Sequence, residues 1–297
     1  MIGELAALGA ALSWTVSALL YKKALEKVNP VSANIIRLSC TSGVLLVFLL
    51  VIGKLWVLWD LPVQIAVLAI VSGLVGLGLG DTLYLVSLRM VGVARAVPLT
   101  CTYPLFNLLW AVFLVGEPLT LSAVLGAVVI VLGIWLLSYE KESIVQGVRR
   151  SVLLKGVVAA LITAVLWSVS ITMMNLAVQE APDLDHALVI NTVRAAAVGG
   201  VLLAFSPVLD RKLDFLRVDR RTIAALVAGG IVALGLGWFF LTYSFVEILE
   251  TRAVPISSTT PLFSTLAGIA LLHEKITAKT ALGSVIIVVG VFLIFLV

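Results

Sequence analysis

Apolar residues run along the chain in stretches of about 20, and short segments that carry most of the charges separate them. The stretches are continuous and do not alternate with a two-residue period, so they predict α-helices and disfavour a β-barrel. Each is long enough to cross a lipid bilayer. We predict ten such helices, at residues 4–21, 33–52, 63–88, 95–115, 119–138, 154–177, 186–206, 222–246, 252–272 and 277–297. The pattern therefore predicts an all-α integral membrane protein.

The composition agrees with this pattern. The 297 residues are 62% hydrophobic and 12% charged, with a mean hydropathy of +1.20. A soluble domain is about half apolar and a quarter charged, so that class is excluded. The first stretch lacks a basic start and a small-residue cleavage site, and we interpret it as a retained helix. Cys40 and Cys101 lie within apolar segments, where we expect both to be buried and no disulfide framework to form.

One segment of the chain returns 157 residues downstream without a gap, since subtracting 80 from 237, or 117 from 274, gives the same offset. The repeated segment comprises Leu-Gly-Leu-Gly at 77–80 and 234–237, Arg-Ala-Val-Pro at 95–98 and 252–255, and Thr-x-Pro-Leu-Phe at 102–106 and 259–263. Self-similarity at a fixed offset indicates an internally repeated architecture. We therefore divide the chain into a first five-helix repeat at 1–139, a connecting loop at 140–153 and a second five-helix repeat at 154–297.

An odd number of helices per repeat places the two repeats in opposite orientations in the membrane. The loop after the first predicted helix carries three lysines between residues 22 and 27, whereas its counterpart at 180–185 carries three acidic residues and no lysine or arginine. Equivalent loops of an inverted pair lie on opposite membrane faces, so only one of them should be basic. The positive-inside rule then places the basic face in the cytoplasm and both termini outside.

Several motifs resemble the EamA-type transporters of the drug/metabolite transporter superfamily. They are Gly116-Glu117-Pro118-Leu119-Thr120 leading into Leu125-Gly126, the Pro-Leu-Phe of the fourth and ninth predicted helices, Trp14 near a serine, and Arg37 at the start of the second helix. The resemblance implies ten helices in two inverted five-helix repeats around a central cavity, lined mainly by helices 1, 3, 4, 6, 8 and 9. It also implies transport of small metabolites, often export of amino acids or toxic analogues, driven by an ion gradient or by exchange.

The chain departs from this family in two respects. The second copy reads His273-Glu274-Lys275, so the glycine before the glutamate is lost. Members of the family are generally described with both termini inside, whereas the charges favour both termini outside. We expect Glu117 and Glu274 to be structural, next to Thr120 and Thr277 as helix N-caps.

Four prolines mark the fourth and ninth predicted helices as candidates for the substrate path. Pro98 and Pro104 have counterparts at Pro255 and Pro261. A proline inside a helix removes a backbone hydrogen bond, and in lipid the freed carbonyls need partners within the protein or a cavity. Paired interruptions at matching positions of two repeats point to a binding site or a hinge. The alternative is a static kink that serves packing only.

Three of the charged residues within the predicted helices are candidates for function. Asp81 is a candidate coupling site for a proton or cation, or a contact for a substrate amine; the alternatives are an ion pair with Arg37 or hydration near the interface. Arg37 and Arg194 occupy equivalent positions, each three residues after an asparagine. They are candidates for gating or for attracting an anionic group, and the alternative is snorkelling to the headgroup region.

The remaining candidate substrate contacts are aromatic and hydroxyl side chains on helices expected to line the cavity: Trp14, Ser17, Tyr84, Thr102, Tyr103, Trp167, Ser170, Trp238 and Thr259. Aromatic rings with a polar tip suit a site for apolar or aromatic metabolites, whereas Trp56 and Trp59 suit an interfacial belt. The hydroxyl groups also suit hydrogen bonds between helices. His186 and His273 are isolated, so no metal or cofactor site is indicated.

These observations predict a secondary transporter in the cell membrane that moves small metabolites, such as amino acids, by alternating access around a central cavity. The gates would be the proline-bearing helices packed against the first and sixth helices. The expected partners are membrane lipids, a metabolite and a coupling proton or cation, but no nucleic acid, and the chain would act as a monomer or homodimer. No enzymatic cluster of nucleophile, acid and base is found. The competing interpretation is a flippase for lipid-linked substrates.

Overall fold

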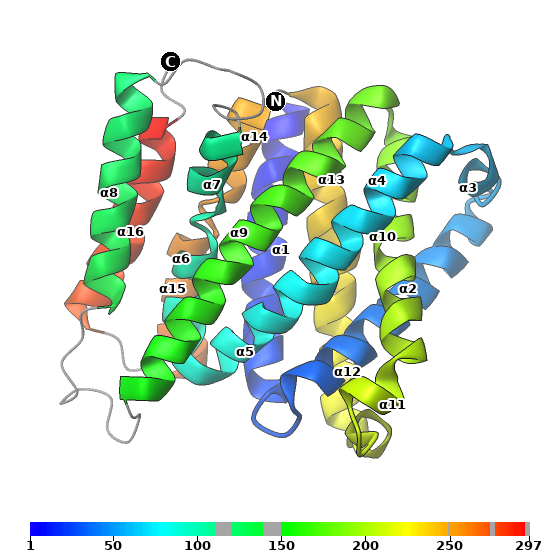
Figure 1. Cartoon of the computed structure of the whole chain (residues 1–297), viewed down its shortest axis with the longest axis horizontal. Helices are drawn as coiled ribbons and strands as arrows, with labels where there is room; N and C mark the ends of the chain where they lie inside the picture. The colour runs from blue at the N-terminus through cyan, green and yellow to red at the C-terminus, as the bar shows by residue number, and fades with distance from the viewer. Residues whose placement is uncertain (111–119, 139–149, 249, 274–276, 295–297) are drawn as a thin grey trace.

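The computed structural model describes residues 1–110, 120–138, 150–248, 250–273 and 277–294. These residues form helices and connecting turns, without a β-strand (Figure 1). Six helical segments are long and apolar enough to cross a membrane: 2–24, 30–51, 63–91, 150–180, 184–204 and 220–247. Shorter apolar helices lie at 124–136, 260–271 and 278–293. The chain is therefore an all-helical, multi-spanning membrane protein.

Four of the long helices are uninterrupted: α1 (Ile2–Ala24), α2 (Pro30–Val51), α9 (Arg150–Glu180) and α10 (Leu184–Ala204). Asn29 caps the start of α2 through its side chain, and Asp183 does the same for α10. In Figure 1, α1 runs from the top of the molecule to the bottom, whereas α9 runs from the bottom to the top. The basic loop after α1 and the acidic loop after α9 therefore lie at opposite ends of the molecule.

Ion pairs tie these loops to neighbouring helices. Lys27, after α1, lies 3.9 Å from Asp219 at the start of α12 (Arg220–Gly230). Lys54, after α2, pairs with Asp185 at the start of α10. The connections also contain the short helices α3 (Val57–Asp60), α11 (Ser206–Leu209) and η3 (Asp214–Arg217). Trp56 and Trp59 are exposed beside α3, as expected for side chains that face a membrane interface.

Two long segments change helix type midway. The first is built from α4 (Val63–Gly73), η1 (Leu74–Gly80) and α5 (Asp81–Val91), and the second from α12, η4 (Ile231–Gly237) and α13 (Trp238–Glu247). Both η1 and η4 are π-helical, and their bounds differ by the 157 residues of the repeat. A π-helical turn inside an α-helix is rare and is frequent at functional sites. The sequence analysis placed helices here but did not predict this change.

An asparagine on a neighbouring helix satisfies carbonyl groups of each π-helical turn. The side-chain nitrogen of Asn34 donates to the carbonyls of Leu77 and Gly78 at 3.1 and 3.3 Å. That of Asn191 donates to the carbonyl of Leu234 at 2.8 Å, and to that of the next residue at 3.5 Å. Since unpaired backbone groups are costly in a membrane, these two side chains stabilise the irregular turns.

The fourth and ninth predicted helices are interrupted near their prolines, where the sequence analysis expected a hinge or a kink, and each interruption divides the span into two helices. The first is broken into α6 (Val93–Thr100) and α7 (Tyr103–Trp110), and the second into α14 (Glu250–Ser257) and α15 (Thr260–Leu272). Pro104 and Pro261 stand second in α7 and α15. There the missing N–H leaves no helical hydrogen bond unmade, so proline favours a fresh helix start over continuation.

Helices α8 (Leu121–Ser138) and α16 (Ala278–Ile294) lie side by side at one edge of the molecule (Figure 1). Glycines let their backbones approach. A Cβ atom on Gly133 would lie 3.0 Å from the carbonyl oxygen of Gly283, and one on Gly290 would lie 2.9 Å from that of Gly126. Such close contacts between small residues are the usual basis of helix association in membranes.

Candidate substrate-binding site

A cavity lies where α1, α2, α5, α9 and the η4–α13 segment meet the break between α6 and α7. Its volume is about 40 Å³. It is lined by Trp14, Ser17, Tyr21, Arg37, Asp81, Tyr84, Cys101, Tyr103, Trp167, Ile171, Ala233, Leu234 and Trp238. Eight of the predicted site residues are therefore brought together here, from segments that lie far apart in the sequence.

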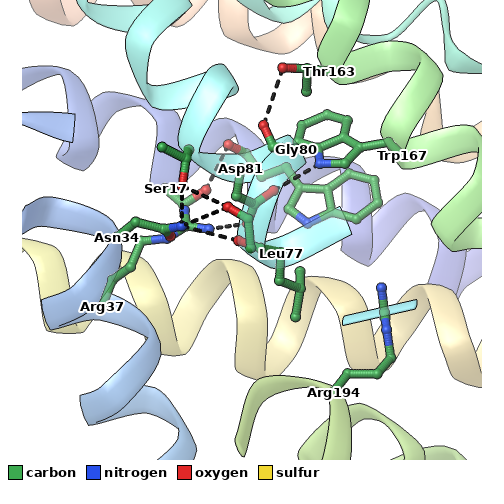
Figure 2. A network of polar contacts seen from close by, with 12 residues as sticks. Ser17, Asn34, Arg37, Leu77, Gly80, Asp81, Thr163, Trp167 and Arg194 are labelled. Atoms are coloured by element: carbon green, nitrogen blue, oxygen red, sulfur yellow. Dashed lines mark hydrogen bonds and ion pairs between the residues drawn. The ribbon is translucent and has the colours of Figure 1, made fainter. Parts of the chain in front are cut away.

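Asp81 is the acidic residue of this cavity, and it is only 2% exposed. Its Oδ2 atom pairs with Nη2 of Arg37, and its Oδ1 atom accepts a hydrogen bond from Nε1 of Trp167 at 2.8 Å (Figure 2). Of the interpretations offered by the sequence, the ion pair with Arg37 is the one observed. Because Trp167 belongs to the second repeat and Arg37 to the first, the carboxylate links both halves of the chain.

Arg37 does not snorkel to the headgroup region, which corrects one alternative of the sequence analysis. Its side chain is buried, and its Nε atom donates to Oδ1 of Asn34 at 2.8 Å. The guanidinium group also lies 4.8 Å from the centroid of the Tyr21 ring. Asn34 thus has two functions, since its nitrogen supports the π-helical turn and its oxygen orients the arginine that holds Asp81.

Arg194, the counterpart of Arg37, has different surroundings. It is fully buried and does not snorkel either. Its Nη2 atom donates to Oγ of Ser170 at 3.0 Å, its Nη1 atom contacts the sulfur of Met174 at 2.8 Å, and its guanidinium lies 4.3 Å from the ring centroid of Trp238. Trp238 stands 157 residues after Asp81, so an aromatic ring occupies the position that the carboxylate has in the first repeat. In Figure 2, Arg194 lies apart from the Asp81 network.

Aromatic rings from both repeats form one wall of the cavity. The ring of Trp238 lies 5.4 Å from that of Trp14 and 6.4 Å from that of Trp167, and Trp167 lies 5.3 Å from Tyr84, measured between centroids. Edge-to-face contacts at these distances stabilise aromatic clusters. The wall is therefore suited to apolar or aromatic compounds.

The final glycine of each Leu-Gly-Leu-Gly copy makes room for these indoles. A Cβ atom on Gly80 would lie 3.0 Å from the Trp167 ring, and one on Gly237 would lie 2.7 Å from Nε1 of Trp14. The glycine of each repeat thus contacts the tryptophan of the other repeat. This contact gives a physical reason for the repeated motif, beyond the general helix packing that the sequence indicated.

The two helix breaks meet beside the cavity. The hydroxyl of Tyr103, the first residue of α7 after the first break, lies 2.8 Å from Oγ of Ser257 and accepts a hydrogen bond from Oγ of Ser258 at 3.1 Å. Tyr103 also lines the cavity. Movement of either broken helix relative to the other would therefore change this contact.

Other predicted site residues lie outside the cavity lining. Thr102 and Thr259 donate to the carbonyls of Leu99 and Ile256, both at 2.7 Å. Ser170 is buried against Ser72 and Arg194. Pro98 lies inside α6, Pro255 belongs to α14, and Pro104 and Pro261 begin the helices after the breaks. These residues shape the breaks and the surroundings of the cavity.

Sequence reasoning missed five residues of the lining: Tyr21, Cys101, Ile171, Ala233 and Leu234. Tyr21 was placed at the end of the first predicted helix, Cys101 was interpreted as a small buried residue, and the apolar side chains of the other three carry no polar signal. The free thiol of Cys40 is exposed, so its predicted burial is wrong, whereas Cys101 is buried. Oγ1 of Thr277 accepts from the main chain of Thr280 at 3.2 Å, as expected of an N-cap. Glu117 and Glu274 lie outside the described residues.

The sequence of this chain is similar to that of known proteins. The sequence profile of the EamA-like transporter family matches residues 1–139 and again residues 154–296. The chain belongs to the EamA-like transporter family. Two proteins of Archaeoglobus fulgidus, each described as an uncharacterized transporter, are similar over nearly their whole length: one is 25% identical over 100% of this chain and 99% of its own, the other 24% identical over 95% and 94%. This EamA-like protein is therefore a multi-pass membrane transporter.

A solved crystal structure shares the fold of this EamA-like chain. It covers 98% of this chain and 96% of its own, with a TM-score of 0.68 at 21% sequence identity. A protein of Clostridium kluyveri, also described as an uncharacterized transporter, is 22% identical over 66% of this chain and 61% of its own.

Proposed function

We propose that this EamA-like protein is a secondary transporter that carries small metabolites through the cavity at Asp81 by alternating access. The observation that carries the proposal is one cavity with a buried ion pair, lined by the π-helical turn η4, by Asp81 directly after the π-helical turn η1, and by a helix break. Irregular backbone at membrane depth is tolerated where it lines a path, and discontinuous helices at matching positions of two repeats are typical of transporter sites.

The ten-helix, inverted-repeat arrangement is part of this proposal. Equivalent features recur at an offset of 157 residues: the π-helical turns, the asparagines that support them and the broken helices. The opposite directions of α1 and α9 in Figure 1 support an inverted relation between the repeats. In such a pair, the two repeats exchange roles as the cavity opens first to one side and then to the other.

The present conformation is a closed one in this scheme. A cavity of about 40 Å³ holds a few water molecules, whereas sites for small molecules measure roughly 300–1,000 Å³. A substrate must therefore displace lining side chains or helices to enter. The aromatic wall around Trp238 and the contact between Tyr103 and Ser257 are the parts that we assign to opening.

Asp81 is the residue that we assign to coupling or to substrate contact. Its carboxylate is held by one group from each repeat, Arg37 and Trp167. A proton or a substrate cation that competes with Arg37 for this carboxylate would release a contact between the repeats. Binding would thereby be linked to movement, which is what ion-coupled transport requires.

The test is transport by the purified chain in proteoliposomes. A panel of amino acids, organic acids, amines and nucleosides is first screened for thermal stabilisation, because a ligand that binds only the folded protein raises its stability. Compounds that bind are then measured for uptake with and without a proton gradient. Accumulation that depends on the protein supports the proposal, and absence of binding and uptake across the panel contradicts it.

Two variants and a lipid assay refine the result. Asp81→Asn is expected to reduce uptake while the protein still inserts into the membrane, and full uptake by this variant would exclude the coupling role. The double variant Arg37→Gln/Asp81→Asn serves as a control, because it removes both charges without leaving one unpaired. A flippase would instead move a fluorescent lipid between leaflets, so protein-dependent lipid movement without metabolite uptake would favour the competing function.

A further inference from the structure

The buried centre of the protein contains more positive than negative charge. The exposed fractions of Arg37, Arg194 and Asp81 are 1%, 0% and 2%. Asp81 is paired with Arg37, and among the side chains that the structure describes no carboxylate lies within 4 Å of Arg194. One guanidinium therefore has no carboxylate in direct contact, at the middle of α10 and far from either end of that helix.

Neutral groups compensate Arg194 only in part. A hydroxyl, a thioether and the face of an indole surround it, and its Nε atom has no hydrogen-bond partner. Burying a charge is costly unless the charge is both paired and hydrogen-bonded. Interfacial snorkelling does not account for this side chain, because it is fully buried within the helix bundle.

The first repeat shows what the second repeat lacks. There, Nε of Arg37 donates to Oδ1 of Asn34, and the guanidinium meets a carboxylate. In the second repeat the equivalent atoms, Nε of Arg194 and Oδ1 of Asn191, are both without a partner. The same hydrogen bond is thus available there but not made. The Trp238 ring covers the guanidinium at the position equivalent to Asp81.

Trp238 separates Arg194 from the cavity. It lines the cavity and also stacks on the guanidinium. Displacement of this one indole would therefore expose an arginine with a free Nε edge to a compound in the cavity. A carboxylate suits that edge, because the planar guanidinium donates two parallel hydrogen bonds to a planar anion.

We propose that the transported compound is an aromatic or apolar acid whose carboxylate pairs with Arg194 and takes the place that Asp81 has beside Arg37. The proposal rests on the proposed transport function and specifies its substrate class. The aromatic wall would hold the apolar part of the compound. Displacement of Trp238 would remove its stacking on Arg194, and the ion pair between Arg194 and the carboxylate of the compound would replace that contact.

A second hollow, with an excess of basic residues, is compatible with an anionic substrate. It has a volume of about 610 Å³ at the end of α1, directly after Tyr21 of the cavity, and its charged lining comprises Lys22, Lys23, Lys27, Arg221 and one acidic residue, Glu26. A hollow lined by one sign of charge raises the local concentration of the opposite ion. Lys27 is paired with Asp219, and the remaining basic residues would raise the local concentration of acids at this end of α1.

The experiment uses matched compounds that share an aromatic ring and a two-carbon linker and differ in the anionic, neutral or cationic group at its end. Indole-3-propionate, its amide and tryptamine share an indole, as 3-phenylpropionate, its amide and phenethylamine share a phenyl ring. Thermal stabilisation of the purified full chain is titrated with each compound. The acids are expected to bind about tenfold or more tightly than the amides, from one charge-assisted pair, and more tightly than the amines.

Variants of Arg194 identify the group responsible. Arg194→Gln should abolish the difference between acid and amide, and Arg194→Lys should retain part of it. If Arg194→Gln does not fold, the order of acid, amide and amine in the natural chain still decides. An amide or amine that binds as tightly as the acid, acids that fail to bind, or an acid preference that survives in Arg194→Gln would each overturn the proposal. A neutral or cationic compound that is transported would overturn it while leaving the transport function intact.

Discussion

The buried ion pair between Arg37 and Asp81 predicts a strong energetic coupling. Both side chains are almost fully buried, and the other groups in contact with them are neutral: Asn34 and Tyr21 for the arginine, and Trp167 for the aspartate. Replacing one partner leaves the other charge buried and unpaired. Such a change typically costs about 3–5 kcal/mol of unfolding free energy. Arg37→Gln and Asp81→Asn should therefore each destabilise the protein by about that amount.

The double variant should be much less damaging than the sum of the single changes. Two unit charges about 4 Å apart attract each other by about 4 kcal/mol at an effective dielectric constant of about 20. Removing both charges loses this attraction but also removes the cost of burying them. Arg37→Gln/Asp81→Asn should thus cost about as much as one single variant or less, which gives a coupling energy of about 3 kcal/mol or more.

The assay is denaturant unfolding of the natural chain, the two single variants and the double variant in the same detergent. Unfolding is followed by tryptophan fluorescence. Arg194→Gln is the matched control, because no described carboxylate pairs with this arginine. Its loss should cost less than that of Arg37, since it removes one cation–π contact of about 2 kcal/mol and relieves an unpaired charge. Additive costs for the two single variants, or equal costs for Arg37→Gln and Arg194→Gln, would refute the reasoning.

Three further predictions follow from other contacts. Gly73→Ala should lower the thermal stability strongly, because its Cβ would lie 2.7 Å from a main-chain carbonyl oxygen of α10, whereas Gly200→Ala, with no atom within 4 Å, should be neutral or slightly stabilising; equal melting temperatures would contradict this. Tyr103→Phe removes the hydrogen bonds between the two helix breaks and should change the rate of uptake more than the affinity for the substrate, which counterflow measurements can separate. Burial would raise the pKa of Asp183, but hydrogen bonds from the main chain and ring of His186 outweigh it and hold the pKa below its usual value. A lowered pKa stabilises the fold above the ordinary carboxyl pKa of about 4 and ceases to do so as the pH falls through the folded value. The melting temperature of Asp183→Ala should accordingly lie below that of the natural chain at pH 7 and approach it under acidic conditions, and a constant difference would exclude this linkage.

Sequence periodicity located the helices well because the membrane imposes a single solvent on them. A span needs about 20 apolar residues, so composition and length mark the segments, and the observed bounds Ile2–Ala24 and Pro30–Val51 differ from the predicted ones by at most three residues. The repeated motifs also directed attention to Asp81 and to the tryptophans that now line the cavity. These signals are local or depend on one fixed offset, which is why they can be read along the chain.

Pairing between residues was less predictable. Asp81 had four interpretations in the sequence, and only the packing of α2 against α5 selected the ion pair with Arg37. The snorkelling alternative for Arg37 failed because burial in the bundle depends on neighbouring helices, which hydropathy does not report. The prolines predicted interruptions of two helices, but a proline that begins a helix, as Pro104 and Pro261 do, and one that kinks it look alike in the sequence.

The sequence by itself determined that this is a multi-spanning helical protein with two related halves, because hydropathy and self-similarity are properties of the chain alone. The resemblance of its motifs also indicated the transporter family that the profile match shows. Only the tertiary structure decided which charges meet. It placed a carboxylate beside Arg37 and an indole over Arg194, although the two arginines occupy the same position in their repeats. The physical reason is that the energy of a buried charge depends on its neighbours across helices, and those neighbours are set by packing in three dimensions.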